Sequence, residues 1–233
     1  MTHTKHTVVF VRHGHSEWNL HNRFTGWTNI PLTEQGLGEA KQAGQRLAEL
    51  DLMFDEAHVS VLTRTRQTAE QLLAGARHPS IPYAASWRLN ERHYGALQGM
   101  NKQEIFSAWG EEQSRKWWRG YYDAPPPLAH DDPRHPRFDP IYDNLDRAQL
   151  PSSESLADCQ ARTLVYWNEV LQPRLLSGRR LLVVSHGNTL RGIVMHIKNI
   201  GPADIERVEI PSAIPLLCEF DNAWNLLMYK WLE

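Results

Sequence analysis

The chain has 233 residues, 41% of them hydrophobic and 22% charged, with a formal net charge of −2. That length suits one large α/β domain or at most two small ones, and we expect a single domain spanning residues 1–233. The charge balance offers no basic field for a nucleic acid. No apolar run approaches the ~20 residues that span a bilayer, the first residues lack a signal peptide's apolar segment, and the two cysteines have no zinc-site spacing. We therefore expect a cytoplasmic protein without a nucleic-acid or membrane partner and without a cysteine-based zinc site.

Two strand-like segments end in the same kind of sequence. Residues 8–11 form an apolar run that stops at Arg12-His13-Gly14, and residues 181–184 form another that stops at Ser185-His186-Gly187-Asn188. Ligands of open α/β sheets bind at the carboxyl ends of the strands. If the two strands are parallel neighbours, His13 and His186 meet in one crevice.

The remaining elements alternate between helix and strand. In chain order we predict a helix over 34–50 capped by Thr33, a strand over 57–61, a helix from about Thr63 to 74, and an edge strand near 81–83. Further on we predict an aromatic helix over 105–122, a long helix from 152 that Pro173 kinks or ends, the strand over 181–184 with its helix, a short helix begun by Pro202, and strands over 216–220 and 226–231. This order predicts a three-layer α/β/α fold with a mostly parallel mixed sheet.

Residues 102–151 differ from the rest of the chain. They hold seven of the fourteen prolines, together with the tryptophans at 109, 117 and 118. A long irregular segment in a compact domain is usually functional. We predict that it is an insertion of the same domain that lies over the ligand edge of the sheet.

The titratable residues at these strand ends suit phosphoryl transfer. Arginine binds phosphate oxygens through two parallel N–H groups, so Arg12 and Arg64 would hold the phosphate, and His186 and Asn188 would add donors. A neutral His13 whose other nitrogen is fixed by a carbonyl, such as that of Gly14, is a competent nucleophile. Glu91, the only carboxylate of the loop over 89–99, would exchange a proton with the reacting oxygen.

Simpler interpretations exist for the same residues. A single histidine near a strand end is more often structural, and Arg66 is best explained as part of a solvated helix face. His13 and His15 could be two metal ligands, although no carboxylate cluster accompanies them. It is the combination of Arg12, His13, Arg64 and His186 that favours a catalytic site.

Several motifs resemble those of the cofactor-dependent phosphoglycerate mutases within the histidine phosphatase superfamily. The similar blocks are RHGHSEWN, NRFTGW, LTEQG, SVLTRTRQT, LNERHYGALQG, LPSSESL, SHGN and EIPSAIPL, which together extend over nearly the whole chain. The LNERHYGALQG block makes the resemblance specific, because simple phosphatases of the superfamily largely lack it.

The resemblance implies an enzyme that interconverts 3-phosphoglycerate and 2-phosphoglycerate in glycolysis and gluconeogenesis. It implies that 2,3-bisphosphoglycerate phosphorylates His13, that Glu91 gives and takes the proton, and that His186 stabilises the transferring group. It further implies small phosphorylated three-carbon acids as substrates, a homo-oligomer (dimer or tetramer) and no metal. The positions that match phosphate- or carboxylate-binding residues are Arg12, Ser16, Asn19, Thr25, Gly26, Arg64, Arg92, Tyr94, Lys102, Arg119, Gly187 and Asn188.

Four features of the sequence depart from that family's pattern. His15 replaces a glutamate, Trp118-Arg119 replaces two consecutive arginines, and Ser212-Ala213 replaces threonine-glycine. The sequence ends at Glu233, where family members often carry a lysine-rich tail over the site. We expect the missing arginine to weaken binding of the substrate's negative end, and an uncovered site to lose phosphoryl groups to water.

Related activities remain open at this stage. A phosphatase or a bisphosphoglycerate synthase would share the phosphohistidine and differ in the acceptor. A binding protein without catalysis is a further alternative, for which Trp118 and His15 are the supporting features.

Overall fold

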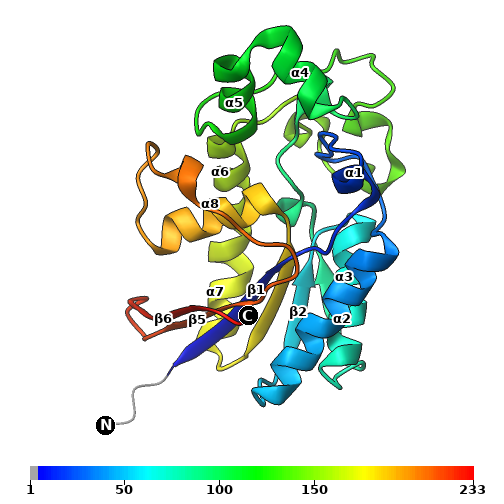
Figure 1. Cartoon of the computed structure of the whole chain (residues 1–233). Helices are drawn as coiled ribbons and strands as arrows, with labels where there is room; N and C mark the ends of the chain where they lie inside the picture. The colour runs from blue at the N-terminus through cyan, green and yellow to red at the C-terminus, as the bar shows by residue number, and fades with distance from the viewer. Residues whose placement is uncertain (1–4) are drawn as a thin grey trace.

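A computed structural model describes residues 5–233, and these residues form one six-stranded mixed sheet (Figure 1). The strands are β1 (His6–Arg12), β2 (Glu56–Val59), β3 (Tyr83–Ala85), β4 (Leu181–Ser185), β5 (Leu216–Phe220) and β6 (Leu226–Trp231). Their order is β3-β2-β4-β1-β5-β6. The first four are parallel to one another, β5 is antiparallel to β1, and β6 is antiparallel to β5. In this sheet β1 and β4 are parallel neighbours, which is the arrangement that lets His13 and His186 meet.

Helices cover both faces of the sheet. Helices α2 (Glu34–Glu49) and α3 (Thr63–Gly75) pack on one face, and α6 (Leu156–Tyr166), α7 (Gln172–Leu176) and α8 (Gly187–Ile197) pack on the other (Figure 1). Side chains of β1 alternate between these two layers: Val8 and Phe10 join one core, and Val9 and Val11 join the other. Burial on both faces explains why the strand is a continuous apolar run. The predicted three-layer α/β/α fold is confirmed.

Most predicted elements are present, with shifted ends. Thr33 caps α2 by accepting a hydrogen bond from the Gly36 N–H. Strand β2 ends at Val59, and β3 is an edge strand that starts at Tyr83, two residues later than predicted. Helix α3 begins at Thr63, as predicted, and its neighbour Leu62 holds the cap position.

Three helix predictions are wrong in detail. The aromatic segment is two helices, α4 (Lys102–Trp109) and α5 (Glu111–Arg119), because Gly110 between them has φ +79°. Helix α6 starts at Leu156 and not at 152, since the Ser155 cap and Asp158 form a capping box. A π-helical turn over Trp167–Leu171 precedes Pro173, and Pro202 lies in a turn before a 3₁₀ helix over Ile205–Arg207.

Helices α4 and α5 lie beyond the carboxyl ends of the parallel strands, as does the short α1 (Glu17–Leu20) (Figure 1). The chain around them contains further 3₁₀ turns over Trp87–Leu89, Gly95–Leu97, Pro136–Phe138, Pro140–Tyr142 and Arg147–Gln149. Part of segment 102–151 therefore lies above the strand ends that carry His13 and His186.

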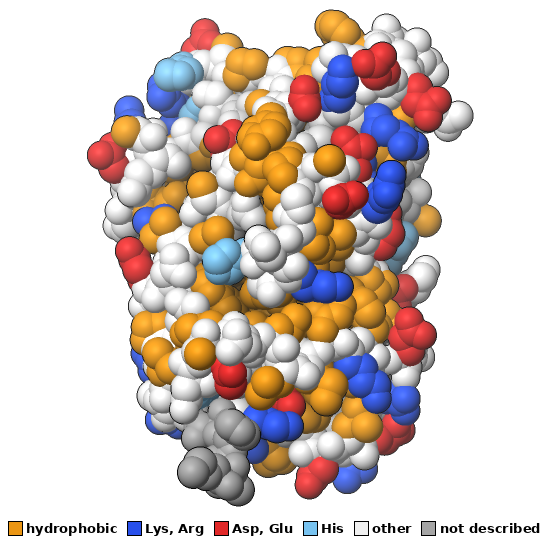
Figure 2. All heavy atoms as spheres, turned by 90° about the vertical axis from the view of Figure 1, so that its left-hand side faces the viewer, with side chains coloured by type: hydrophobic (Ala, Val, Ile, Leu, Met, Phe, Trp, Pro, Cys, Tyr) orange, Lys and Arg blue, Asp and Glu red, His pale blue; other side chains and the backbone are white. Residues whose placement is uncertain are grey.

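The face of the molecule on the β6 side of the sheet is partly apolar. Figure 2 shows hydrophobic side chains gathered in a band across that face of the molecule, and Leu227 and Met228 of β6 are exposed. None of the helices within residues 5–233 is both long enough and apolar enough to cross a membrane.

Candidate active site

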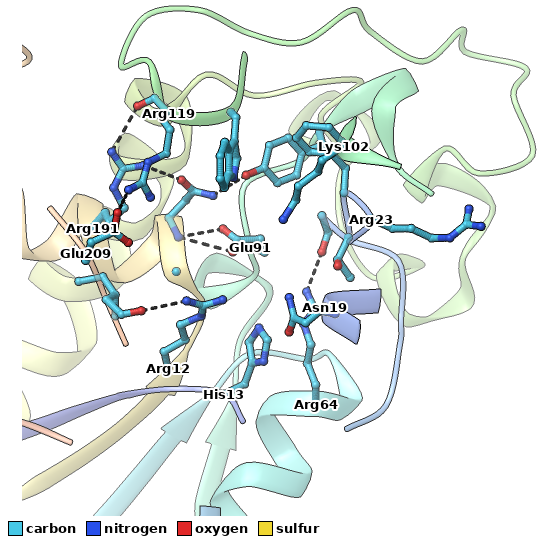
Figure 3. A pocket seen from close by; sticks show the side chains of 18 residues that line it. Arg12, His13, Asn19, Arg23, Arg64, Glu91, Lys102, Arg119, Arg191 and Glu209 are labelled. Carbon is cyan, nitrogen blue, oxygen red and sulfur yellow. Dashed lines mark hydrogen bonds and ion pairs between the residues drawn. The ribbon is translucent and has the colours of Figure 1, made fainter. Parts of the chain in front are cut away.

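A polar cavity of about 150 Å³ lies at the carboxyl ends of β1 and β4. It is smaller than the ~300–1,000 Å³ pockets of drug-sized ligands, so a small ligand fits it best. Its lining combines β1, α1, α3, α4, α5 and α8 with the loops between them (Figure 3). The residues that line it are Arg12, His13, Asn19, Arg23, Phe24, Thr25, Gly26, Arg64, Glu91, Tyr94, Lys102, Trp118, Arg119, Gly187, Asn188, Arg191, Glu209 and Ile210.

The lining carries far more positive than negative charge. Five arginines and Lys102 line the cavity, against the two carboxylates Glu91 and Glu209. Burial, the largest cause, lowers the pKa of Arg64 to about 10 and that of Lys102 to about 8, so both remain mainly cationic at neutral pH. A small anion with more than one negative group suits this lining.

His13 is held at the end of β1 with a defined tautomer. Its backbone N–H donates to the Ser185 carbonyl of β4 at 3.0 Å, and its Nδ1 donates to the Gly14 carbonyl at 2.7 Å. A carbonyl oxygen only accepts, so Nδ1 carries the proton and Nε2 keeps its lone pair. The predicted carbonyl partner of His13 is confirmed. Gly14 is required here because a Cβ atom would clash with the carbonyl oxygen of Gly36.

The surroundings of His13 keep its ring neutral. The side chain is buried, and burial together with the cations Arg64 and Arg12 holds its pKa well below 6.5. A neutral imidazole with a free Nε2 lone pair can act as a nucleophile at neutral pH.

His186 lies next to His13, with ring centroids 5.1 Å apart, but it does not line the cavity. Its Nδ1 accepts from Arg64 Nε at 3.2 Å, and therefore its Nε2 donates to Ser60 Oγ at 2.8 Å. Arg64 in turn donates to the Gly26 and Thr28 carbonyls. In this state His186 orients the Arg64 guanidinium and offers no free donor of its own.

Glu91 projects into the cavity from the loop after β3 (Figure 3). Its Oε1 accepts from the backbone N–H groups of Arg92 at 2.8 Å and Asn188 at 3.1 Å. Its backbone carbonyl accepts from Trp27 Nε1 and from Arg162. These bonds fix both the main chain and the carboxylate, which leaves Oε2 near the first residues of α8.

Known proteins are similar in sequence to this chain over nearly its whole length. The model of the histidine phosphatase superfamily (branch 1) matches residues 8–135 and 129–227. A 2,3-bisphosphoglycerate-dependent phosphoglycerate mutase of Hamiltonella defensa is 43% identical over 97% of this chain and 90% of its own. An enzyme of the same name from Parabacteroides distasonis is 46% identical over 95% of this chain and 89% of its own.

The chain belongs to the histidine phosphatase superfamily. The fold agrees with those of solved structures. A phosphoglycerate mutase from Bacillus anthracis superposes with a TM-score of 0.69, covering 98% of this chain and 92% of its own at 17% identity. At that identity the likeness concerns the fold alone.

Most of the residues that match the superfamily motifs line the one cavity. Those that do are Arg12, His13, Asn19, Thr25, Gly26, Arg64, Glu91, Tyr94, Lys102, Arg119, Gly187 and Asn188. Three matched residues, His186, Ser16 and Arg92, lie behind the lining. Ser16 caps α1 and bonds Asn19, and the buried Arg92 guanidinium donates to the Trp117, Trp118 and Gly120 carbonyls at the end of α5.

Sequence reasoning missed other residues of the lining, among them Arg23, Arg191 and Glu209. Arg191 is buried and donates to Asn188 Oδ1, while the Asn188 amide donates to the Tyr94 hydroxyl. The sequence signal for Arg191 was its place three residues after Asn188, which puts both side chains on the same face of α8. Arg23 bonds the Gly99 carbonyl, and Figure 3 shows its guanidinium turned outward.

Buried neutral histidines make stability depend on pH in this superfamily member. Burial is the largest cause that lowers the pKa of His58 to about 4 and of His93 to about 3, and it lowers those of His13 and His186 as well. The unfolded chain, with histidine pKa values near ~6.5, then binds more protons below that pH, so stability is complete above it and falls as pH falls. Each such histidine changes the free energy of unfolding by up to about 1.4 kcal/mol per pH unit.

Urea unfolding between about pH 7.5 and about pH 5.5 measures this effect. We expect the free energy of unfolding to change little above about pH 7 and to fall increasingly steeply below it, with a shallower slope in His58→Gln. His21 is exposed, so His21→Gln should keep the original slope. A free energy that stays constant over the range would contradict the prediction.

Proposed function

We propose that this protein interconverts 3-phosphoglycerate and 2-phosphoglycerate through a phosphohistidine that 2,3-bisphosphoglycerate forms. The observation that carries the proposal is the fixed, neutral His13 at the base of a small cavity lined by cations. Relatives more than 40% identical over almost the whole chain bear the name of this activity. We also propose that the enzyme is cytoplasmic and homo-oligomeric.

Priming begins with attack by His13. Nε2 attacks a phosphorus of 2,3-bisphosphoglycerate, a P–N bond forms, and the P–O bond to the carbon skeleton breaks. The departing oxygen takes a proton from Glu91, and a monophosphate is released. Arg12 and Arg64 stabilise the negative charge on the transferring oxygens, while Nδ1–H on the Gly14 carbonyl stabilises the ring as it becomes cationic.

Turnover transfers the phosphoryl group from His13 to one hydroxyl of the substrate and then takes the other phosphoryl group back. The free hydroxyl of 3-phosphoglycerate attacks the phosphohistidine and gives its proton to Glu91, which forms 2,3-bisphosphoglycerate in the site. Transfer of the other phosphoryl group back to His13 leaves 2-phosphoglycerate. Lys102, Arg119 and the N–H groups at the start of α8 hold the negative groups that do not react.

Incubation with 2,3-bisphosphoglycerate followed by mass spectrometry of the intact and digested protein tests the proposed nucleophile. We expect one added phosphate, located on the peptide that contains His13 and lost in acid. A protein that gains no phosphate would behave as a binding protein without catalysis, and phosphate found on His186 would reject the assignment of His13.

Glu91→Gln is expected to slow phosphoryl transfer by about 10²–10⁴-fold, the usual contribution of a positioned acid or base. The glutamine oxygen can still accept from Arg92 and Asn188, so the loop and the fold should remain. Single-turnover kinetics with 2,3-bisphosphoglycerate measures the effect. Glu104→Gln on α4 removes a carboxylate outside the cavity and serves as the matched control. A loss smaller than about tenfold would assign the proton to another group.

A further inference from the structure

The cavity contains a carboxylate that the proposed chemistry does not use. Glu209 lines the wall and forms an ion pair with Arg119 of α5. Figure 3 shows Glu209, Arg119 and Arg191 together on one side of the cavity, with Lys102 on the other side and His13 with Arg64 below. A carboxylate in a cavity lined mostly by cations repels anionic ligands, so it can affect which anions the site binds.

The backbone of Glu209 is fixed next to the site. The carbonyl of Ile210, the next residue, accepts from the Arg12 guanidinium at 2.9 Å, so the loop before β5 is tied to the phosphate-binding end. The Glu209 side chain itself is 72% exposed, whereas that of Arg119 is 20% exposed. The carboxylate can therefore turn to solvent while Arg119 stays in the wall.

The part of the cavity lined by Lys102, Trp118 and Arg119, here named the distal end, is less positive than its two cations suggest. The centroid of the Trp118 ring lies 5.1 Å from Lys102 Nζ and 5.4 Å from Arg119 Cζ. Both cations thus contact an aromatic face, and Arg119 is in addition paired with Glu209. A ligand group that reaches Arg119 must displace this carboxylate or lie beside it.

Repulsion from the Glu209 carboxylate grows with the charge of the arriving group. A phosphate dianion at the distal end is penalised more than a carboxylate or a hydroxyl there, and a ligand that occupies only the His13 end is hardly affected. We propose that Glu209 is a specificity-determining residue that weakens binding of ligands with a strongly charged distal end. This role rests on the proposed function, since the affected ligand is 2,3-bisphosphoglycerate, the priming cofactor.

Equilibrium binding to His13→Ala protein tests the proposal, because no phosphoryl transfer accompanies binding. Calorimetry compares this background with and without Glu209→Gln, using 2,3-bisphosphoglycerate and inorganic phosphate as the two probes. Phosphate has no second negative group, so it cannot occupy the His13 end and the distal end at once. We expect Glu209→Gln to tighten bisphosphate binding about five- to tenfold and phosphate binding less than about twofold, with the difference shrinking at high salt.

Matched variants separate this effect from a structural one. Glu112→Gln removes a carboxylate from the exposed side of the same helix as Arg119 and should change neither affinity. Glu209→Ala should reproduce Glu209→Gln. With His13 intact, Glu209→Gln should lower the bisphosphate concentration that half-saturates phosphorylation.

Unchanged affinity, weaker bisphosphate binding, or equal tightening for both probes would overturn the role of Glu209. These outcomes are independent of the proposed function. If the wild-type protein converts no phosphoglycerate but Glu209→Gln still tightens bisphosphate binding selectively, the mutase proposal fails and the role of Glu209 stands. If the wild-type protein converts phosphoglycerate but the variant shows no change in affinity, the mutase proposal stands and the role of Glu209 fails.

Discussion

His13→Ala is expected to lower the rate of phosphoglycerate interconversion by about 10⁴-fold or more, since the nucleophile is removed outright. The His13 side chain has one hydrogen bond, to the neighbouring Gly14 carbonyl, so its loss should leave the sheet and the cavity in place. A coupled assay for 2-phosphoglycerate measures the rate, and circular dichroism with thermal unfolding checks the fold.

The exposed His21 provides the control for this variant. His21→Ala removes an imidazole from the same N-terminal region and should retain the wild-type rate. Substantial interconversion by folded His13→Ala protein would contradict the mechanism, because no other described imidazole lines the cavity.

Arg162→Met is expected to lower the free energy of unfolding by about 3–5 kcal/mol, the range for breaking one half of a buried ion pair. Arg162 bonds Glu154 through Nε at 2.7 Å and through a terminal nitrogen at 2.9 Å, and both side chains are about 95% buried. The same guanidinium donates to the carbonyls of Arg88, Asn90 and Glu91. Its removal leaves a buried carboxylate and several carbonyls without this donor, in the loop that positions Glu91.

Urea unfolding measures the loss, and Arg174→Met is the matched control. Arg174 pairs with Glu56 on the surface and is 54% exposed, so its substitution should cost less than about 1 kcal/mol. Arg162→Met should also reduce the rate of transfer, because the Glu91 main chain loses one of its anchors. A free energy of unfolding for Arg162→Met within about 1 kcal/mol of the wild-type value would show that this ion pair does not hold the loop.

The sheet was predictable because its central strands are buried on both faces. Residues 8–11 and 181–184 can bury such apolar runs only between two helical layers, and each run ends in polar residues where the ligand edge begins. The position of His13 followed from that boundary, and the Gly14 carbonyl was one candidate for its hydrogen-bond partner.

Helix breaks and the cavity wall were harder to predict. The pattern of aromatic and charged residues continues through Gly110, and only the backbone conformation there divides α4 from α5. Glu209 is an ordinary surface residue by its local sequence. It enters the cavity because its loop bonds Arg12, 198 residues distant from Ile210, and no local pattern carries such a contact.

The mutase activity itself is tested by following conversion of 3-phosphoglycerate to 2-phosphoglycerate, with and without added 2,3-bisphosphoglycerate, while free phosphate is measured in parallel. We expect fast conversion that depends on the bisphosphate, with free phosphate released more slowly than 2-phosphoglycerate is formed. Release of free phosphate with little conversion would argue against a mutase, and would make the protein a phosphatase built on the same phosphohistidine.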